Sequence, residues 1–429
     1  MRARVFGWVT VAAALVAASA MTGSVAAAST HGSAPAHIGH AHVLAPSSLG
    51  PRTLAPFTGG QLVYHGGPVM TGPTRSIAIF WEPSRLQSGA RAAVSVRYNR
   101  VLTRYLTDVG GKGLYGVTSQ YSGIRNASTL VTTYRDTSRY PASKCPAAFP
   151  TSTQRMNCLT DAQVQAEVRK VMKARHLAGG LQQIFFVFLS RGEYTCINRS
   201  ACFLYPINSR GLPQGYCAYH SYFPAGSRNV VYADMPYGNT LFSSKAGTSR
   251  GLCASQSVFP NDRAGDIEAS MTSHEQLEAV TDPLLNAWWD SSGMEVADKC
   301  AYDITGSTLD GGIANELWAG HFYALQTEWD NATESCVPGG SFSPSPRSVA
   351  RGSAVSLTGV NYTPGATLTV TLKDSARAVT VLGTVSVGAD GSFTGQSVTI
   401  PAGAAAGAAA ISLSGPGAGD GSTEAVTLS

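Results

Sequence analysis

The stretch around which this chain is organised reads His274-Glu275-Gln276-Leu277-Glu278-Ala279-Val280-Thr281-Asp282-Pro283. Positions four residues apart share one face of an α-helix, so His274 and Glu278 can bind one ion together. Glu275 lies on the flank of that face, where it can polarise a water molecule held by the ion. The pattern is that of the zinc-hydrolase helix His-Glu-x-x-His, with glutamate in place of the second histidine.

The neighbouring residues predict that this stretch is a helix facing the interior. Apolar and candidate ligand positions recur at spacings of four, three and four, at Ile267, Met271, His274 and Glu278. A buried carboxylate is costly without a partner, and a cation is the strongest partner available. Pro283 disfavours helix at the residue before it, so the helix should end near Thr281. The alternative is a surface helix with solvated glutamates and a hydrogen-bonded core histidine. From the four-residue pattern alone, this surface helix and the buried metal-binding helix are roughly equally favoured.

The residues after the helix offer a third ligand. Glu295 and Asp298 arrive together, beside Cys300, which can anchor their segment. A catalytic zinc site needs a third protein ligand and an open position for water. We expect Asp298 to be that ligand, with Glu295 either supporting it or replacing it. The two carboxylates would share one side in a helical turn and point apart in a strand. In the alternative reading they only cap a loop.

Several ordered motifs resemble the phosphate-induced (exordium-like) secreted proteins of plants and their bacterial relatives, over about residues 61–336. The helix and its sequel carry the main likeness: Ser273-His274-Glu275-Gln276-Leu277-Glu278, Asn286-Ala287-Trp288 and Glu295-Val296-Ala297-Asp298-Lys299-Cys300. Three more segments are similar: Tyr64-His65-Gly66-Gly67-Pro68-Val69-Met70-Thr71-Gly72, Cys217-Ala218-Tyr219-His220, and Leu325-Gln326-Thr327-Glu328-Trp329 continuing to Cys336. Plant members usually have Asn where this chain has Asp282, which argues against Asp282 as an essential ligand. The resemblance implies an extracellular protein, and the plant members are discussed mainly as growth regulators.

The amino terminus has the features of a secretory signal. Arg2 and Arg4 precede a run of small and apolar residues, and Ala26-Ala27-Ala28 fits a cleavage site, so residues 1–28 are expected to be removed. Residues 29–60 are rich in Ala, Pro, Ser, Gly and His without periodicity, which predicts a disordered leader. Its histidines, His31, His37, His40 and His42, are expected to be solvated, with loose metal binding as the alternative.

Cysteine and charge content limit the class of protein. Eight cysteines, an even number, are typical of an oxidising compartment, and the protein is expected to be secreted. Pairing of neighbours suggests Cys145–Cys158, Cys196–Cys202, Cys217–Cys253 and Cys300–Cys336, although eight cysteines allow about 105 pairings. The net charge of +5 is modest and no dense cluster of Lys and Arg occurs, so a nucleic-acid partner is not expected. We find no membrane-anchor signal, and we expect a monomer. Abundant Ala, and Arg in preference to Lys, indicate a high-GC bacterial genome.

Residues 61–336 are expected to form one α+β or α/β core. Strands are predicted at 76–81, 130–134, 183–189 and 230–234, and helices at 90–109 and 160–175, the latter with a capping box completed by Gln163. Zinc-peptidase (zincin-like) folds place a strand along the substrate cleft, shortly before their His-Glu helix. The comparison with this chain is an analogy. His220 could approach the site or be an ordinary loop histidine beside a disulfide.

The composition changes after Cys336. Residues 337–346 are predicted to be a linker. Residues 347–429 lack Cys, His and Trp and contain short alternating strands, for example at 354–358, 367–372 and 409–413. This spacing predicts a small β-sandwich, which is similar to bacterial immunoglobulin-like modules.

The sequence therefore predicts a secreted zinc-dependent hydrolase, with a peptide or protein as substrate. His274, Glu278 and Asp298 would hold zinc and Glu275 would be the general base. No cysteine nucleophile is expected, because all eight cysteines are predicted to be paired. The main alternative is a non-catalytic extracellular protein that binds a cell-wall component or a partner and has a structural or vestigial metal site. A glycoside hydrolase using Glu275 and Glu278 is a third possibility, but it leaves His274 without a role.

Overall fold

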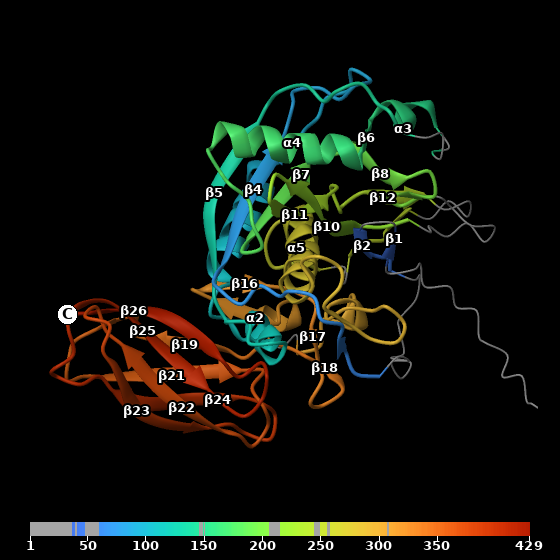
Figure 1. The fold of residues 1–429 in the computed structure, drawn as a ribbon. Coiled ribbons are helices and arrows are strands. Elements are labelled where there is room, and N and C mark those ends of the chain that lie inside the picture. The colour runs from blue at the N-terminus through green and yellow to red at the C-terminus, as the bar shows by residue number, and fades with distance from the viewer. Residues whose placement is uncertain are drawn as a thin grey trace, which may run out of the picture. The chain divides into compact units, whose positions relative to one another are not determined.

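The computed structural model describes residues 37–38, 41–47, 60–145, 149, 151–205, 215–243, 249–254, 258–306 and 309–429. Within these residues the protein is a mixed α/β structure with several sheets, followed by an all-β region (Figure 1). Two separate clusters of buried apolar side chains correspond to the two parts, one ending at Trp329 and the other spanning Phe342 to Leu428.

A seven-stranded mixed sheet forms the centre of the first part (Figure 1). Its strands, in spatial order, are β1 (His37–Ile38), β2 (Ala41–Leu44), β10 (Ala218–Ala225), β11 (Arg228–Met235), β7 (Gln183–Leu189), β4 (Thr74–Trp81) and β5 (Ser128–Asp136). Strands β11, β7, β4 and β5 run parallel, while β10 is antiparallel to both β11 and β2. All four predicted core strands are confirmed. The apolar run in β7 is buried on both faces because this strand lies inside the sheet.

Strand β2 corrects the prediction of a disordered leader. Residues Ala41–Leu44 form a fully buried strand that pairs antiparallel with β10. Composition averaged over residues 29–60 predicts disorder, but the short run Ala-His-Val-Leu adds apolar side chains to the sheet at the edge of β10. The other leader residues, except for the backbone of His37–Ile38 and residues 45–47 and 60, lie outside the described part of the chain.

Two helices cover opposite faces of the sheet at β10. The Tyr219 hydroxyl donates to Asp161 of α4 (Asp161–Ala174), at 2.9 Å. The next residue, His220, contacts Glu275 of α5 (Arg263–Thr281). Because successive strand residues point to opposite faces, α4 and α5 lie on opposite sides of the sheet, as Figure 1 shows.

The two other predicted helices are also present. Helix α4 is preceded by Thr160, and the predicted capping box with Gln163 is confirmed. Helix α1 (Val96–Asp108) begins six residues later than the predicted Ala90, because Ser95 caps it by accepting a hydrogen bond from the Tyr98 N–H. Helix α1 packs against α5.

Helix α5 ends at Thr281 as predicted, and it is buried on all sides rather than along one stripe. Gln276, on the side away from His274, is satisfied by Tyr105, Ser76 and Ser128 at 2.9–3.2 Å. Other elements thus surround α5, and they supply hydrogen-bond partners for its buried polar side chains. The alternative of a surface helix with solvated glutamates is therefore wrong.

Burial of α5 makes one of its glutamates sensitive to pH. Burial raises the pKa of Glu268 to about 8, although the Gly238 N–H donates to it at 2.9 Å. Between its ordinary pKa near 4.5 and about 8 the folded protein keeps this proton and the unfolded chain loses it. The contribution to stability therefore falls as pH rises through this window, by up to about 1.4 kcal/mol per unit. We expect Glu268→Gln to flatten the pH dependence of Tm between pH 5 and 8, measured by thermal denaturation. An unchanged slope would contradict this assignment.

Shorter elements surround the central sheet. Those before α5 are β3 (Val63–Tyr64), α2 (Gly113–Gly116), η1 (Val117–Gln120), α3 (Ser152–Met156), β6 (Cys158–Thr160), β8 (Tyr194–Asn198), β9 (Ala201–Cys202), β12 (Leu241–Ser243) and β13 (Ser249–Gly251). Those after it are β14 (Trp288–Trp289), η2 (Asp298–Cys300), η3 (Asp310–Gly312), β15 (Glu316–Trp318), β16 (His321–Tyr323), β17 (Glu328–Asp330) and β18 (Ser335–Val337).

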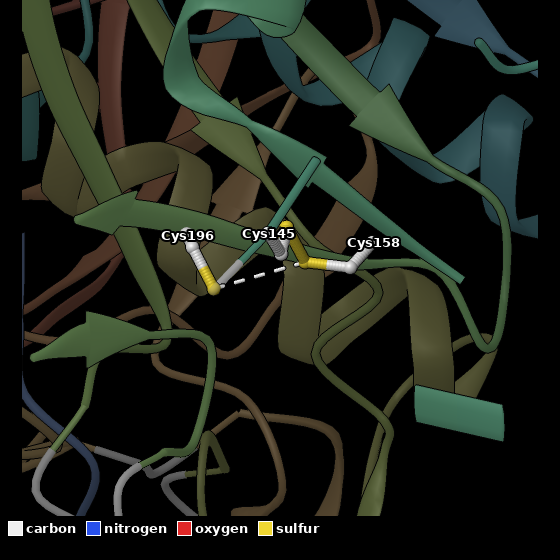
Figure 2. Close-up of side chains that lie close together, drawn as sticks. All are labelled: Cys145, Cys158 and Cys196. Carbon is white, nitrogen blue, oxygen red and sulfur yellow. Dashed lines mark hydrogen bonds between the residues drawn. A yellow bond between two sulfur atoms is a disulfide. The ribbon is translucent and has the colours of Figure 1, made fainter. Parts of the chain in front are cut away.

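Four disulfides join Cys145–Cys158, Cys196–Cys202, Cys217–Cys253 and Cys300–Cys336, so the neighbour pairing is confirmed. The first two lie side by side, with Cys158 Sγ and Cys196 Sγ 3.7 Å apart (Figure 2). Four disulfides are consistent with an exported protein. Among the described residues, no helix is both long and apolar enough to cross a membrane.

We expect reduction to destabilise this part strongly, because a structural disulfide in a secreted domain contributes about 2–5 kcal/mol. Thermal denaturation with and without a reductant measures the loss. Mass spectrometry that finds four or more free thiols in the native exported protein would contradict the prediction.

The all-β part consists of two sheets around its own apolar cluster. One contains β19 (Ser341–Ser345), β21 (Ala354–Val360) and β24 (Phe393–Thr399). The other contains β20 (Ser348–Val349), β26 (Ser422–Leu428), β25 (Gly407–Ser414), β22 (Thr367–Lys373) and β23 (Val379–Ser386). The three predicted strands lie in β21, β22 and β25. Strand β19 falls inside the predicted linker 337–346, because residues 341–345 pair with β21.

Candidate metal centre

Helix α5, β10, β2 and the turn before η2 bring seven ionisable side chains together. They are His42, His220, His274, Glu275, Glu278, Glu295 and Asp298. Six of them are completely buried and Asp298 is 5% exposed. Three groups within this set place possible ligand atoms within 4.8 Å of one another: His274, Glu278 and Asp298; His220, Glu275 and Glu278; and His42, Glu278 and Glu295.

The three predicted ligands form the first group. His274 Nε2 lies 3.1 Å from Glu278 Oε1 and 3.6 Å from Asp298 Oδ1. The helix places His274 and Glu278 one turn apart, as the sequence predicts. Asp298 reaches them because its own backbone N–H donates to Glu278 Oε1 at 3.1 Å. One cation lying between these three atoms would have nitrogen and oxygen ligands of the kinds that zinc accepts.

Gln326 orients the imidazole of His274. Its Oε1 lies 3.2 Å from His274 Nδ1, and its Nε2 donates to the Ala297 carbonyl at 3.0 Å. With Nδ1 engaged in this way, Nε2 faces Glu278 and Asp298. Such outer hydrogen bonds fix the tautomer and ring direction of a metal-binding histidine. Gln326 lies in one of the segments that resemble exordium-like proteins, but the sequence did not indicate that it orients His274.

Glu295 and Asp298 point to the same centre. The turn before η2 brings the Glu295 N–H to Asp298 Oδ2, at 3.2 Å. This is the helical-turn alternative rather than the strand. The disulfide Cys300–Cys336 holds the segment from its other end. Both carboxylates are in contact with His42, so Glu295 remains the alternative ligand.

His42 is the residue whose place in the centre the sequence did not predict, although loose metal binding by the leader histidines was the alternative. Its Nε2 lies 2.5 Å from Asp298 Oδ2 and 3.8 Å from Glu278 Oε2, and its Nδ1 lies 2.9 Å from Glu295 Oε1. The expectation that it is a solvated leader residue is wrong, because β2 places it inside the centre. The only signal available was that His42 stands between small and apolar residues.

His220 also lies in the centre, as one of its two interpretations proposed. Its Nδ1 is 3.4 Å from Glu275 Oε2 and 3.7 Å from Glu278 Oε2. In the β2–β10 register it stands directly opposite His42, and the two rings stack with centroids 5.6 Å apart. The three histidines thus surround Glu278.

Burial and the mutual contacts of these side chains set the electrostatics of the centre. Burial, and then Glu278, raise the pKa of Glu275 well above its usual range, and burial likewise raises that of Glu295. Burial alone would lower the pKa of His42, but Glu295, Asp298 and Glu278 raise it well above its ordinary value. Burial would raise the pKa of Asp298, yet contact with His42 lowers it. Four carboxylates in so small a volume repel one another, and divalent cations would neutralise them.

Asp282 has a different role. Its Oδ1 accepts from the Asn286 and Ala287 N–H groups at 2.6 and 2.7 Å, so it shapes the chain that leaves α5. Burial raises its pKa to about 6. It belongs to none of the three groups of possible ligands found among the described residues.

A segment close to the amino terminus of the core packs beside this turn. The Gly67 N–H donates to the Asn286 carbonyl at 2.8 Å, and β3 pairs with β14. A side chain at Gly67 would collide with Asn286, because an added Cβ would come within 2.0 Å of its Oδ1. Two motifs more than 200 residues apart therefore support the end of α5 together.

The cysteines Cys145, Cys158 and Cys196 form another compact group (Figure 2). All three are in disulfides, so they cannot offer the thiolates that bind zinc. The histidine–carboxylate centre is thus the better candidate.

No protein-family model matches this chain, and no curated protein matches it.

Proposed function

We propose that the protein is a secreted zinc-dependent hydrolase that cleaves peptide bonds. The observation that carries the proposal is the convergence of His274 Nε2, Glu278 Oε1 and Asp298 Oδ1 at 3.1–3.6 Å, with Glu275 as the next residue on the same helix. This group offers three protein ligands, the number found in catalytic zinc sites. We also propose that the core is related to exordium-like proteins and that the carboxyl-terminal part is an immunoglobulin-like module.

Each side chain has a definite task in this mechanism. Zinc would supply Lewis-acid polarisation of the attacking water and of the scissile carbonyl. Glu275 accepts a proton from the water as its oxygen bonds to the carbonyl carbon. Glu275 then returns the proton to the leaving nitrogen as the carbon–nitrogen bond breaks. His220, 3.4 Å from Glu275, positions that carboxylate.

The main alternative is a non-catalytic binding protein with a structural metal. One observation favours it: His42 lies where it could complete a set of four protein ligands, and structural zinc sites are closed in this way. The glycoside hydrolase is less well supported, because His274 lies between Glu278 and Asp298, a position that an acid/base pair does not need.

The test is to measure metal and hydrolysis on the same purified protein. We expect about one zinc per chain by elemental mass spectrometry, and cleavage of a peptide library that stops on chelation and returns with zinc. A chain that takes up no zinc would end the proposal. A zinc-loaded chain that cleaves no peptide, with or without residues 37–47 in place, would favour the binding protein.

A further inference from the structure

The candidate centre is sealed by a strand from the amino-terminal side of the core. Strand β2 pairs with β10 through Ala218↔Leu44, Tyr219↔Val43, His220↔His42 and Ser221↔Ala41. All four β2 residues are buried. Because the residues of the centre are also shielded from solvent, a substrate cannot reach Glu275 while β2 is in place.

His42 contacts two of the three predicted ligands through their second oxygens, and there it would take the position that catalysis needs open. It approaches Asp298 and Glu278 from the strand side, opposite α5, at 2.5 and 3.8 Å. Three ligands leave room for a reacting group on zinc, whereas a fourth protein ligand closes the site. A hydrolase with this centre therefore has to exchange His42 for substrate and water.

The attachment of β2 is short enough to be exchanged. It has four residues, and within the described part of the chain its outer neighbour is the two-residue β1. After β2, the described residues 45–47 are held by two groups. The Tyr302 hydroxyl donates to the Ala45 carbonyl at 2.7 Å, and the Ser47 hydroxyl and N–H both donate to the Leu252 carbonyl at 2.8 Å. Local opening of a peripheral element costs less free energy than unfolding of the whole core.

Resting on the proposed function, we infer that the edge of β10 is the binding site for an extended peptide substrate, and that Ala41–Leu44 is a displaceable mimic of it. When β2 leaves, Ala218–Ser221 present backbone groups that pair with another extended strand, the mode called β-augmentation. The substrate residue opposite His220 then stands over Glu275 and the three ligands, in the place of His42. This position selects an extended peptide over a sugar chain, because a sugar lacks the repeating N–H and C=O groups.

The experiment separates β2 from the core without removing other residues. A recognition site for a sequence-specific protease is placed within residues 48–59, and the zinc-loaded chain is cut and freed of its amino-terminal fragment. We expect zinc to stay at about one per chain and peptide hydrolysis to rise roughly tenfold or more, as the fourth position opens. In the uncut chain His42→Ala removes the contacts of β2 with Asp298 and Glu278, so β2 should leave β10 more often and hydrolysis should rise as well. His176→Asn, a change at an exposed histidine with positive φ, should have no effect.

A binding measurement tests the β10 edge apart from activity. A labelled synthetic peptide with the sequence of residues 37–47 should bind the cut protein by fluorescence anisotropy and inhibit hydrolysis. The same peptide with alanine for His42 should bind roughly tenfold more weakly, the scale expected when a principal contact is lost. Loss of zinc on cutting would overturn the inference, because His42 would then be a permanent ligand. Failure of the peptide to bind would overturn it as well. Peptide binding without hydrolysis in any form would keep the β10 site and end the peptidase proposal.

Discussion

Replacing His274 or Glu278 by alanine is expected to abolish zinc binding and to destabilise the core. Each change removes one of the three atoms that converge in the first group. His274→Ala also leaves Glu278 and Asp298 without their histidine partner, and Glu278→Ala leaves His274 without its nearest carboxylate. Breaking a buried charged pair costs about 3–5 kcal/mol. Elemental mass spectrometry measures the metal, and thermal denaturation measures the stability.

Two further variants make this test sharper. Gln326→Ala should weaken zinc binding only by roughly 10–100-fold, because Gln326 orients His274 without binding the ion itself. His176→Asn serves as the exposed histidine control and should change neither quantity. Full zinc binding by both alanine variants at the centre would place the ion elsewhere.

Glu275→Gln is expected to slow peptide hydrolysis by roughly 100-fold or more while zinc binding and Tm remain close to those of the wild type. The amide keeps the size of the side chain but cannot accept the proton of the attacking water. The comparison is best made in both the uncut and the cut chain, so that access to the centre does not limit the rate. Glu268→Gln is the matched control, since it makes the same change at another fully buried glutamate of α5.

The outcome for Glu275→Gln also distinguishes two places for the ion. Glu275 belongs to the second group of possible ligands, with His220 and Glu278. If Glu275→Gln loses zinc, the ion occupies that group and Glu275 is a ligand rather than the base. If it keeps zinc and hydrolyses peptides at the wild-type rate, the general-base role is wrong.

The local features of the site were predictable because they depend on spacing along one helix. The pairing of His274 with Glu278 and the end of α5 before Pro283 follow from helix geometry alone. The strand in residues 183–189 and the cap of α4 are equally local, since they need only a run of apolar residues or two side chains three positions apart. The four disulfides also join cysteines that neighbour each other in sequence.

The sequence by itself determined the helix with its two candidate ligands and the adjacent glutamate, together with the strands and the short-range cysteine pairs. Only the tertiary structure decided that α5 is buried on all sides, that Gln326 orients His274, and that His42 enters the centre. The physical reason is distance along the chain. His42 and Asp298 are 256 residues apart, and only the pairing of β2 with β10 brings them into contact. No local pattern in residues 29–60 could indicate that pairing, because it depends on an open edge formed by strands more than 170 residues away.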